Sequence, residues 1–306
     1  MNAAVPDISV LVPSYGYAHF LRDGIESVLK QGRTDDPATS HLPVIEVIVQ
    51  DGGSTDGTVD LLESYGDAII WRSEKDGGQS DALNRAFALS SGRWIAWLNA
   101  DEFYLPGGLV ALVEEGDRSG ADVVYGDTAF VDANGRLTRL VPQHGFSPSI
   151  LRSYGCFISS VSSIVRRDAV GPDPIDISMR RMMDWDLYLR LLDDGSRFSH
   201  VPMPVGAFRA HDTRVTATET RGFMQRLNED DGFGREYDMM RDRYGAFRAR
   251  KLGHVGHGVR KLTDGAYVRQ LRARRLRGVN LRWFDDPGGA DGCRLLLAGA
   301  YGRDGA

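Results

Sequence analysis

The segment Val44-Ile45-Glu46-Val47-Ile48-Val49-Gln50-Asp51-Gly52-Gly53-Ser54-Thr55-Asp56 decides the fold class of this chain. It begins as an apolar run of strand length and changes abruptly to Asp-Gly-Gly-Ser, which is typical of a tight loop. The last residues of the loop are good N-caps for a helix that carries Val59, Leu61 and Leu62. A buried strand that leads through a tight loop into a helix predicts one repeating unit of an α/β sheet.

The same unit recurs over the first 115 residues, where short apolar runs alternate with segments of helical period. This alternation predicts an α/β fold with a Rossmann-like, mostly parallel sheet flanked by helices. The expected strands are Ile8–Val12, Val44–Val49, Ala68–Trp71 and Trp94–Leu98, and the expected third helix is Gln79–Ser90.

The pattern changes near residue 122, after which the strand-like runs are shorter and a leucine-rich helix follows Asp184. We therefore divide the chain into a first half, 1–122, a smaller second half, 123–240, that completes the site, and an extension, 241–306. The glycine-rich end of the extension, after Pro287, is expected to be poorly ordered.

Charge is distributed unevenly along the 306 residues, whose net charge is −5. The stretch 248–282 holds eleven Lys and Arg against one acidic residue, Asp264. Two hypotheses follow: that Arg269, Arg272, Arg274, Arg275 and Arg277 contact a nucleic acid or an anionic membrane, or that the basic extension is a solvated face or a clamp on the acidic body of the same protein. No nucleic-acid motif accompanies these arginines.

Two cysteines, Cys156 and Cys293, provide neither a disulfide framework nor a paired-cysteine zinc site. The N-terminus lacks the features of a secretory signal, and no run of about 18 apolar residues occurs. We expect a cytoplasmic protein, with peripheral contact at the inner membrane face as a further hypothesis.

Polar residues follow three of the expected strands at the point where each strand ends. They are Pro13-Ser14-Tyr15, Asp51 and Asn99-Ala100-Asp101, and the carboxyl ends of parallel strands are where such sheets bind ligands. Asp101 and its neighbours could hold a divalent cation and a diphosphate together. Asp51 and Asn99 also suit ordinary turns, so both interpretations stay open.

Two further places in the second half could carry chemistry. Asp184-Trp185-Asp186 opens the leucine-rich helix, with Asp184 in its first turn, and these acidic residues either cap the helix or one of them acts as a general base. His211 follows an apolar run and is either a metal ligand or a packing residue.

Five stretches taken in order resemble a family 2 glycosyltransferase, an inverting enzyme with the GT-A fold. They are Ser9–Tyr15, Val47–Thr58, Asp76–Ala86, Trp94–Glu102 and Asp184–Leu191. The resemblance implies that 1–122 is the nucleotide-sugar-binding half and 123–240 the acceptor-side half. It also implies a nucleotide-binding set of Pro13, Tyr15, Asp51, Gln79, Asn84, Asn99 and Ala100, a metal-binding set of Asp101 and His211, and Asp184 as the general base.

The implied reaction is transfer of a sugar from a nucleoside-diphosphate sugar to an acceptor hydroxyl, in enzyme class EC 2.4. UDP-sugars are favoured as donors, with dTDP- and GDP-sugars open, and Mn²⁺ or Mg²⁺ is the expected cofactor. The acceptor class is open among carbohydrates, lipid-linked molecules and small molecules.

Two departures from the family pattern leave an alternative open. Asn99 replaces the first aspartate of the usual Asp-x-Asp motif, and Met183 stands where relatives often carry glutamate. The alternative is a degenerate transferase that binds only nucleotide-sugar or protein. A nucleotidyltransferase and a dinucleotide-dependent oxidoreductase are disfavoured, because no glycine-rich phosphate loop follows the first strand.

Overall fold

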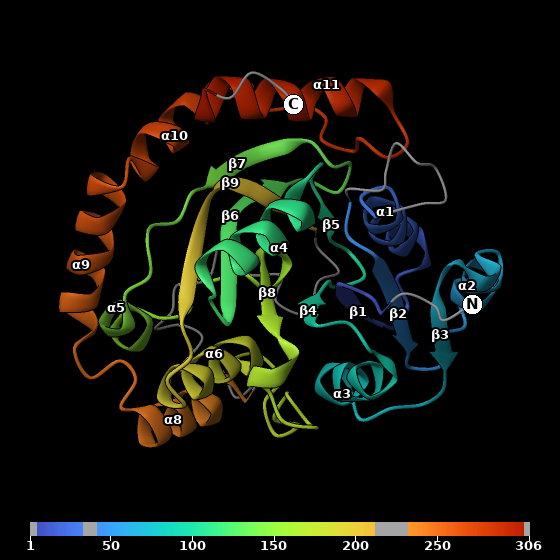
Figure 1. The fold of residues 1–306 in the computed structure, drawn as a ribbon, viewed down its shortest axis with the longest axis horizontal. Coiled ribbons are helices and arrows are strands. Elements are labelled where there is room, and N and C mark those ends of the chain that lie inside the picture. The colour runs from blue at the N-terminus through green and yellow to red at the C-terminus, as the bar shows by residue number, and fades with distance from the viewer. Residues whose placement is uncertain (1–4, 33–41, 212–231, 303–306) are drawn as a thin grey trace.

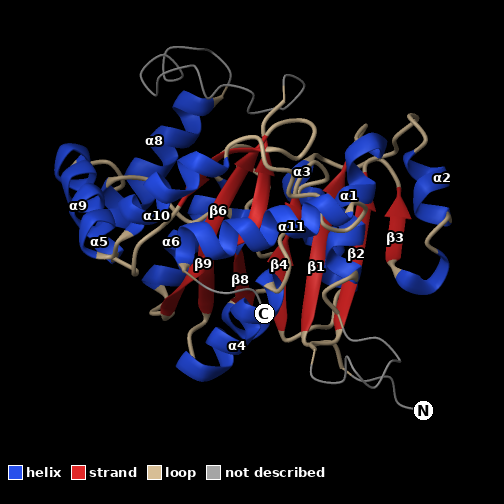
Figure 2. Cartoon of the chain, turned by 90° about the horizontal axis from the view of Figure 1, so that it is seen from above, coloured by secondary structure: helices blue, strands red, loops and turns tan. Residues whose placement is uncertain are grey.

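The computed structural model describes residues 5–32, 42–211 and 232–302 (Figure 1). Its centre is a nine-stranded sheet with the order β3-β2-β1-β4-β8-β6-β9-β5, and β7 pairs with β6 beside this path. The fold is the α/β class that the sequence predicts, with helices on both faces of the sheet (Figures 1 and 2).

The first four strands are mutually parallel, as expected for strands joined by crossover helices. The expected third strand begins later than predicted, because residues 66–68 form a 3₁₀ turn that takes Ala68 out of it. The strands are β1 Ile8–Ser14, β2 Ile45–Asp51, β3 Ile70–Ser73 and β4 Trp94–Trp97, and the helices between them are α1 Ala18–Leu29, α2 Thr58–Glu63 and α3 Gln79–Leu89.

The second half extends the same sheet with a different pairing pattern. Strand β8 (Ser163–Arg166) is antiparallel to both β4 and β6, whereas β6 (Val123–Val131) and β9 (Phe198–Arg209) are parallel to each other. The other elements are β5 Phe103–Tyr104, α4 Gly108–Ser119, β7 Leu137–Val141, α5 Pro148–Ser153, α6 Met183–Asp193 and α8 Phe233–Tyr244.

Two apolar layers cover the faces of the sheet. Along β1, Val10 and Val12 belong to the apolar cluster that includes residues of α1, α2 and α4, while Leu11 between them belongs to the cluster that includes residues of α3, α5, α6 and α8. This alternation follows from the two-residue period of a strand, and it explains why the strands of the first half are apolar on both faces. No helix in the described parts of the chain has the length and apolarity needed to cross a bilayer.

The described part of the C-terminal extension forms helices, also after Pro287. Helices α9 (Arg250–Thr263), α10 (Ala266–Ala273) and α11 (Pro287–Leu296) follow one another around the outside of the molecule (Figure 1). Glycines in α11 allow close packing: a Cβ at Gly292 would lie 1.9 Å from the carbonyl oxygen of Asn280. The missing side chain of Gly292 therefore allows the helix to contact the preceding chain.

Arg269 belongs to this extension and faces the body of the protein. Its guanidinium lies 3.3 Å from the Asp127 carboxylate and donates a hydrogen bond to the Gln143 carbonyl. The clamp interpretation thus holds for Arg269, whereas Arg272, Arg274, Arg275 and Arg277 are exposed.

Candidate active site

A cleft of about 570 Å³ lies at the carboxyl ends of β1 and β4, next to the first turns of α3 and α6. This volume suits a ligand of the size of a nucleotide. The structure brings seven of the predicted residues to its wall: Pro13, Tyr15, Gln79, Asn99, Ala100, Asp101 and Asp184.

Asp101 lies next to His211, the predicted second metal ligand. Nε2 of His211 is 2.9 Å from Oδ2 of Asp101, and both side chains are more than nine-tenths buried. Two adjacent ligands of an octahedral ion with bonds of 2.0–2.1 Å lie about 2.9 Å apart, so this spacing fits a shared cation. The rings of Tyr17 and Phe20, at the start of α1, pack against the imidazole.

The protein alone supplies an incomplete shell for such a cation. Within the described residues, no group of three His, Cys, Asp or Glu side chains converges on one point. Magnesium-like ions are commonly held by one or two protein ligands together with substrate phosphates and water. The Asp101–His211 pair therefore fits an ion that a diphosphate completes.

Asn99 occupies the position of the missing aspartate and is held by three side chains. Its Oδ1 accepts hydrogen bonds from Gln79 Nε2 and Trp97 Nε1, at 2.6 and 2.8 Å, and its Nδ2 donates to Glu102 Oε2 at 3.0 Å. An ionised aspartate cannot make the third contact, because a carboxylate has no proton to donate. The amide of Asn99 thus suits the buried Glu102 carboxylate beside it.

Asp184 lies in the first turn of α6, as predicted, and lines the cleft. Its Oδ1 accepts a hydrogen bond from the Trp185 backbone N–H at 2.8 Å. Burial raises the pKa of the Asp184 carboxyl to about 6, and the charge of Glu236 acts in the same direction. A carboxyl with this pKa is ionised at neutral pH yet basic enough to accept a proton.

Glu236, on α8, is a residue that no sequence pattern singles out. Its carboxylate accepts hydrogen bonds from the backbone N–H groups of Arg180, Arg181 and Met182, at 2.9–3.0 Å. These three residues lead directly into the helix of Asp184. Glu236 therefore fixes the approach to α6 from a distance of about fifty residues along the chain.

Asp51 does not line the cleft, and its side chain is fully buried. Its carboxylate accepts hydrogen bonds from the backbone N–H groups of Gly53 and Ser54 and from the Ser73 hydroxyl. The turn interpretation thus describes its contacts. The predicted hydrogen bond to a base stays a prediction, one that requires the carboxylate to exchange one of these partners.

Asn84 also lies away from the cleft, although α3 carries Gln79 into it. Its side-chain amide donates to the Ile175 carbonyl at 2.8 Å and accepts from the Ile175 N–H at 2.9 Å. These two bonds tie α3 to the segment before α6. The structure thus gives Asn84 a scaffolding contact, and its donor-binding role stays a prediction.

Several cleft residues were not selected from the sequence. Gly52 is placed so that a Cβ would lie 3.2 Å from both the Tyr15 ring and the Asp76 carboxylate, so its lack of a side chain keeps this corner of the cleft open. The only sequence signal for Gly52 itself was that a glycine directly follows a strand end. The other lining residues with charged or hydroxyl groups are Ser14, Tyr17, Lys75, Asp76, Glu102, Ser159, Ser160, Arg180 and Arg181.

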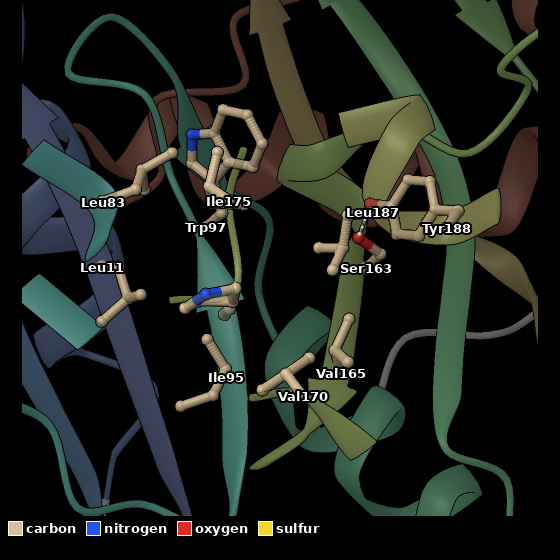
Figure 3. A pocket seen from close by; sticks show the side chains of 12 residues that line it. Leu11, Leu83, Ile95, Trp97, Ser163, Val165, Val170, Ile175, Leu187 and Tyr188 are labelled. Carbon is tan, nitrogen blue, oxygen red and sulfur yellow. Dashed lines mark hydrogen bonds between the residues drawn. The ribbon is translucent and has the colours of Figure 1, made fainter. Parts of the chain in front are cut away.

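A second, small cavity of about 40 Å³ lies between α3 and α6, under the sheet (Figure 3). Its lining is apolar except for Ser163 and Tyr188, whose hydroxyl groups bond to each other at 2.7 Å. Because these polar groups are satisfied and the space is small, we assign it to core packing. The cleft remains the candidate site.

These features are those of an α/β protein with a cleft of nucleotide size and acidic residues at the carboxyl edge of its sheet. The model of glycosyl transferase family 2 matches residues 9–210, and the chain belongs to this family. It is accordingly a glycosyltransferase with the GT-A fold.

Curated relatives have the same class of name. The chain is 28% identical over 214 residues to the PGL/p-HBAD biosynthesis glycosyltransferase of Mycobacterium bovis, covering 65% of this chain and 75% of the relative. It is 24% identical over 253 residues to an uncharacterized glycosyltransferase of Rickettsia typhi, covering 75% of each.

Solved structures of S. aureus TarS share the fold. The complex of TarS 1–349 with UDP matches with a TM-score of 0.55 at 16% identity, covering 97% of this chain and 92% of TarS 1–349. The complex with UDP-GlcNAc matches with a TM-score of 0.51 at 16% identity, covering 95% and 90%.

Proposed function

We propose that this protein is an inverting glycosyltransferase that moves a sugar from a UDP-sugar to an acceptor hydroxyl, with Asp184 as the general base. The observation that carries the proposal is that Asp101 and Asp184 line one cleft of nucleotide size. The Asp101 carboxylate is paired with the His211 imidazole, as in a cation site, and burial raises the pKa of Asp184. Two carboxylates in different environments suit two roles.

The nucleoside is assigned to the corner formed by Tyr15, Gly52 and Asp76. The ring of Tyr15 is largely exposed and offers a surface for stacking, and Gly52 leaves room beside it. UDP is the favoured nucleotide because the structurally similar TarS was solved with UDP and with UDP-GlcNAc.

The diphosphate is assigned to the Asp101–His211 end of the cleft, with Mn²⁺ or Mg²⁺ as the cofactor. A divalent cation bound there would neutralise the negative charge that grows on the departing UDP. Lys75, Arg180 and Arg181 are the basic side chains on the cleft wall, and they add positive charge toward the same leaving group.

Asp184 is assigned the proton transfer. Its carboxylate accepts the proton of the acceptor hydroxyl while that oxygen forms a bond to the anomeric carbon and the bond from this carbon to UDP breaks. Attack from the face opposite the leaving group inverts the anomeric configuration. The reaction needs no covalent sugar–enzyme intermediate, so a single base suffices.

A thermal-shift screen of the purified chain against UDP, dTDP, GDP and their sugars, with and without Mn²⁺, tests the donor assignment. We expect UDP and at least one UDP-sugar to raise the melting temperature, and the shift to grow with Mn²⁺. A shift with dTDP or GDP alone would correct the base. The absence of a shift with any nucleotide would overturn the proposal.

A further inference from the structure

Helix α9 exposes its apolar side to solvent, whereas a helix that packs on a protein body normally buries it. Its large apolar side chains, Leu252, Val255, Val259 and Leu262, are 74, 65, 55 and 69% exposed. Their spacing of three, four and three residues places them on one side of the helix. A helix that covers a core normally turns such a stripe inward.

The opposite side of α9 faces the protein and is formed by small and polar residues. Gly253, His257 and Lys261 are buried there. A Cβ at Gly253 would lie 2.4 Å from the Ser153 hydroxyl, and the His257 ring nitrogen lies 2.9 Å from that of His144. The helix is therefore docked through its polar side, and the apolar side is left to contact something else.

Helix α10 continues the apolar surface. Tyr267, Val268 and Leu271 are 44, 51 and 62% exposed, whereas Ala266 and Ala273 are buried against the body. Both helices lie on the outer rim of the molecule (Figure 1). We call the seven exposed residues, Leu252, Val255, Val259, Leu262, Tyr267, Val268 and Leu271, the α9–α10 face.

The side chains around this face are basic. Between residues 248 and 277 the only acidic residue is Asp264, which is half-buried and accepts a hydrogen bond from the Gly145 backbone N–H at 2.7 Å. The exposed charges of α9, α10 and the residues that flank them therefore have one sign. The exposed basic residues are Arg248, Lys251, Arg260, Arg272, Arg274, Arg275 and Arg277.

We propose that the α9–α10 face binds the surface of an anionic lipid bilayer. Apolar side chains on one side of a helix, flanked by Lys and Arg, suit the boundary between headgroups and acyl chains. Each basic residue near such a surface adds electrostatic attraction to anionic lipid. A second copy of the chain is a poorer occupant, because a two-fold contact would bring the two basic rims against each other.

Co-sedimentation of the full chain with vesicles tests this proposal. Vesicles of phosphatidylglycerol and phosphatidylcholine in equal parts should retain the protein, and vesicles of phosphatidylcholine alone should retain at least tenfold less. The variant Leu252→Gln/Val255→Gln/Leu262→Gln should lower the partition coefficient at least tenfold, and so should Arg272→Gln/Arg275→Gln/Arg277→Gln. Leu295→Gln, on α11 and 53% exposed, is the matched control and should bind as the wild type does.

Because the substituted side chains are exposed, the variants should keep the circular dichroism and melting temperature of the wild type. Full retention of the apolar variant on anionic vesicles would overturn the proposal. A second result would also overturn it: the wild type binds neither kind of vesicle, light scattering shows that it is a dimer, and the apolar variant is a monomer. The α9–α10 face would then join two copies of the chain. Neither result depends on the sugar-transfer activity.

Discussion

Nε2 of His211 lies 2.9 Å from Oδ2 of Asp101, although 110 residues separate them in the chain. The contact depends on β9, which ends two residues before the histidine. There Arg209 forms a buried ion pair with Asp23 of α1 at 2.6 Å, and its guanidinium stacks over the Phe20 ring. The end of β9 is thus fixed to α1, and His211 is held against Asp101, which lines the cleft.

From the contact between Asp101 and His211 we predict that UDP binding depends on a metal ion and that both residues are needed for this dependence. We expect Asp101→Ala and His211→Ala each to lower UDP affinity at least tenfold in Mn²⁺, with little effect in the presence of EDTA. Isothermal titration calorimetry under both conditions measures this. A metal requirement unchanged in Asp101→Ala would remove that residue from the metal site.

From the hydrogen bond between Asn99 and Glu102 we predict that a substitution of Glu102 compensates for the effect of a substitution of Asn99. Asn99→Asp should place two carboxylates side by side, raise the pKa of one of them, and lower both the melting temperature and the UDP affinity. Adding Glu102→Gln should restore both quantities, because the new amide at position 102 can donate a hydrogen bond to the introduced carboxylate. If Asn99→Asp alone tightens metal-dependent UDP binding without a loss of stability, the amide does not have the role that its contacts indicate.

Asp51 and the adjacent Gly52 should respond differently to substitution. Asp51→Ala leaves several polar groups of its loop without a partner, so it should lower the free energy of unfolding by about 2 kcal/mol and weaken UDP binding with or without metal. Gly52→Leu should weaken UDP binding while the protein stays as stable as the wild type. Denaturant unfolding and calorimetry separate the two effects, and normal UDP affinity in Gly52→Leu would exclude this corner as the nucleoside site.

Much of the fold was predictable because its first half obeys local rules. The runs at Ile8, Val44 and Trp94 are apolar on both faces and end at polar residues, and they form strands within two residues of their expected bounds. A strand before His211 was indicated, but the bounds of β9 were not predicted, because Pro202 and Pro204 interrupt its apolar run. The structure accommodates Pro204 where the register with β6 shifts.

The site was predictable to the extent that its residues stand at strand or helix ends. Asp101 and Asp184 line the cleft because each is carried there by its own element. Glu236 was missed because its contact with the loop before α6 joins distant parts of the chain, and no local pattern reveals such a contact. Sequence alone did not separate the two roles of Asp51, since a turn and a binding loop use the same residue types.

Glu236 predicts a shift in the pH dependence of the reaction. Removing its charge should lower the pKa of Asp184, because the negative charge of Glu236 helps to raise it. In Glu236→Gln the acidic limb of the kcat profile should therefore move to lower pH, and weakened bonds to the loop should lower kcat severalfold. UDP affinity should stay within about twofold of the wild type. An acidic limb that does not move would limit Glu236 to a structural role.

We predict that the ionised Asp184 carboxylate is needed for activity and lowers the free energy of unfolding. Its carboxyl must be ionised to act as a base, so kcat/KM should rise with pH through about 6 and level off above it. Burial raises the pKa of Asp184 in the folded state above its value in the unfolded chain. The ionised carboxylate therefore destabilises the fold above pH 6, and this destabilisation disappears at low pH, where the carboxyl is protonated in both states. Asp184→Asn should accordingly raise the free energy of unfolding by roughly 1–2 kcal/mol at neutral pH, and by much less near pH 4. Denaturant unfolding at the two pH values measures this difference.

The most direct test of the central claim is the rate of UDP release from the preferred UDP-sugar in Mn²⁺, compared between the wild type and Asp184→Asn, with UDP affinity measured on the same samples. We predict a rate at least a hundredfold lower in Asp184→Asn and an unchanged UDP affinity, because the substitution removes the base and leaves the donor contacts in place. A variant that keeps more than a tenth of the wild-type rate, or that loses UDP affinity along with its activity, would contradict the assignment of Asp184 as the general base.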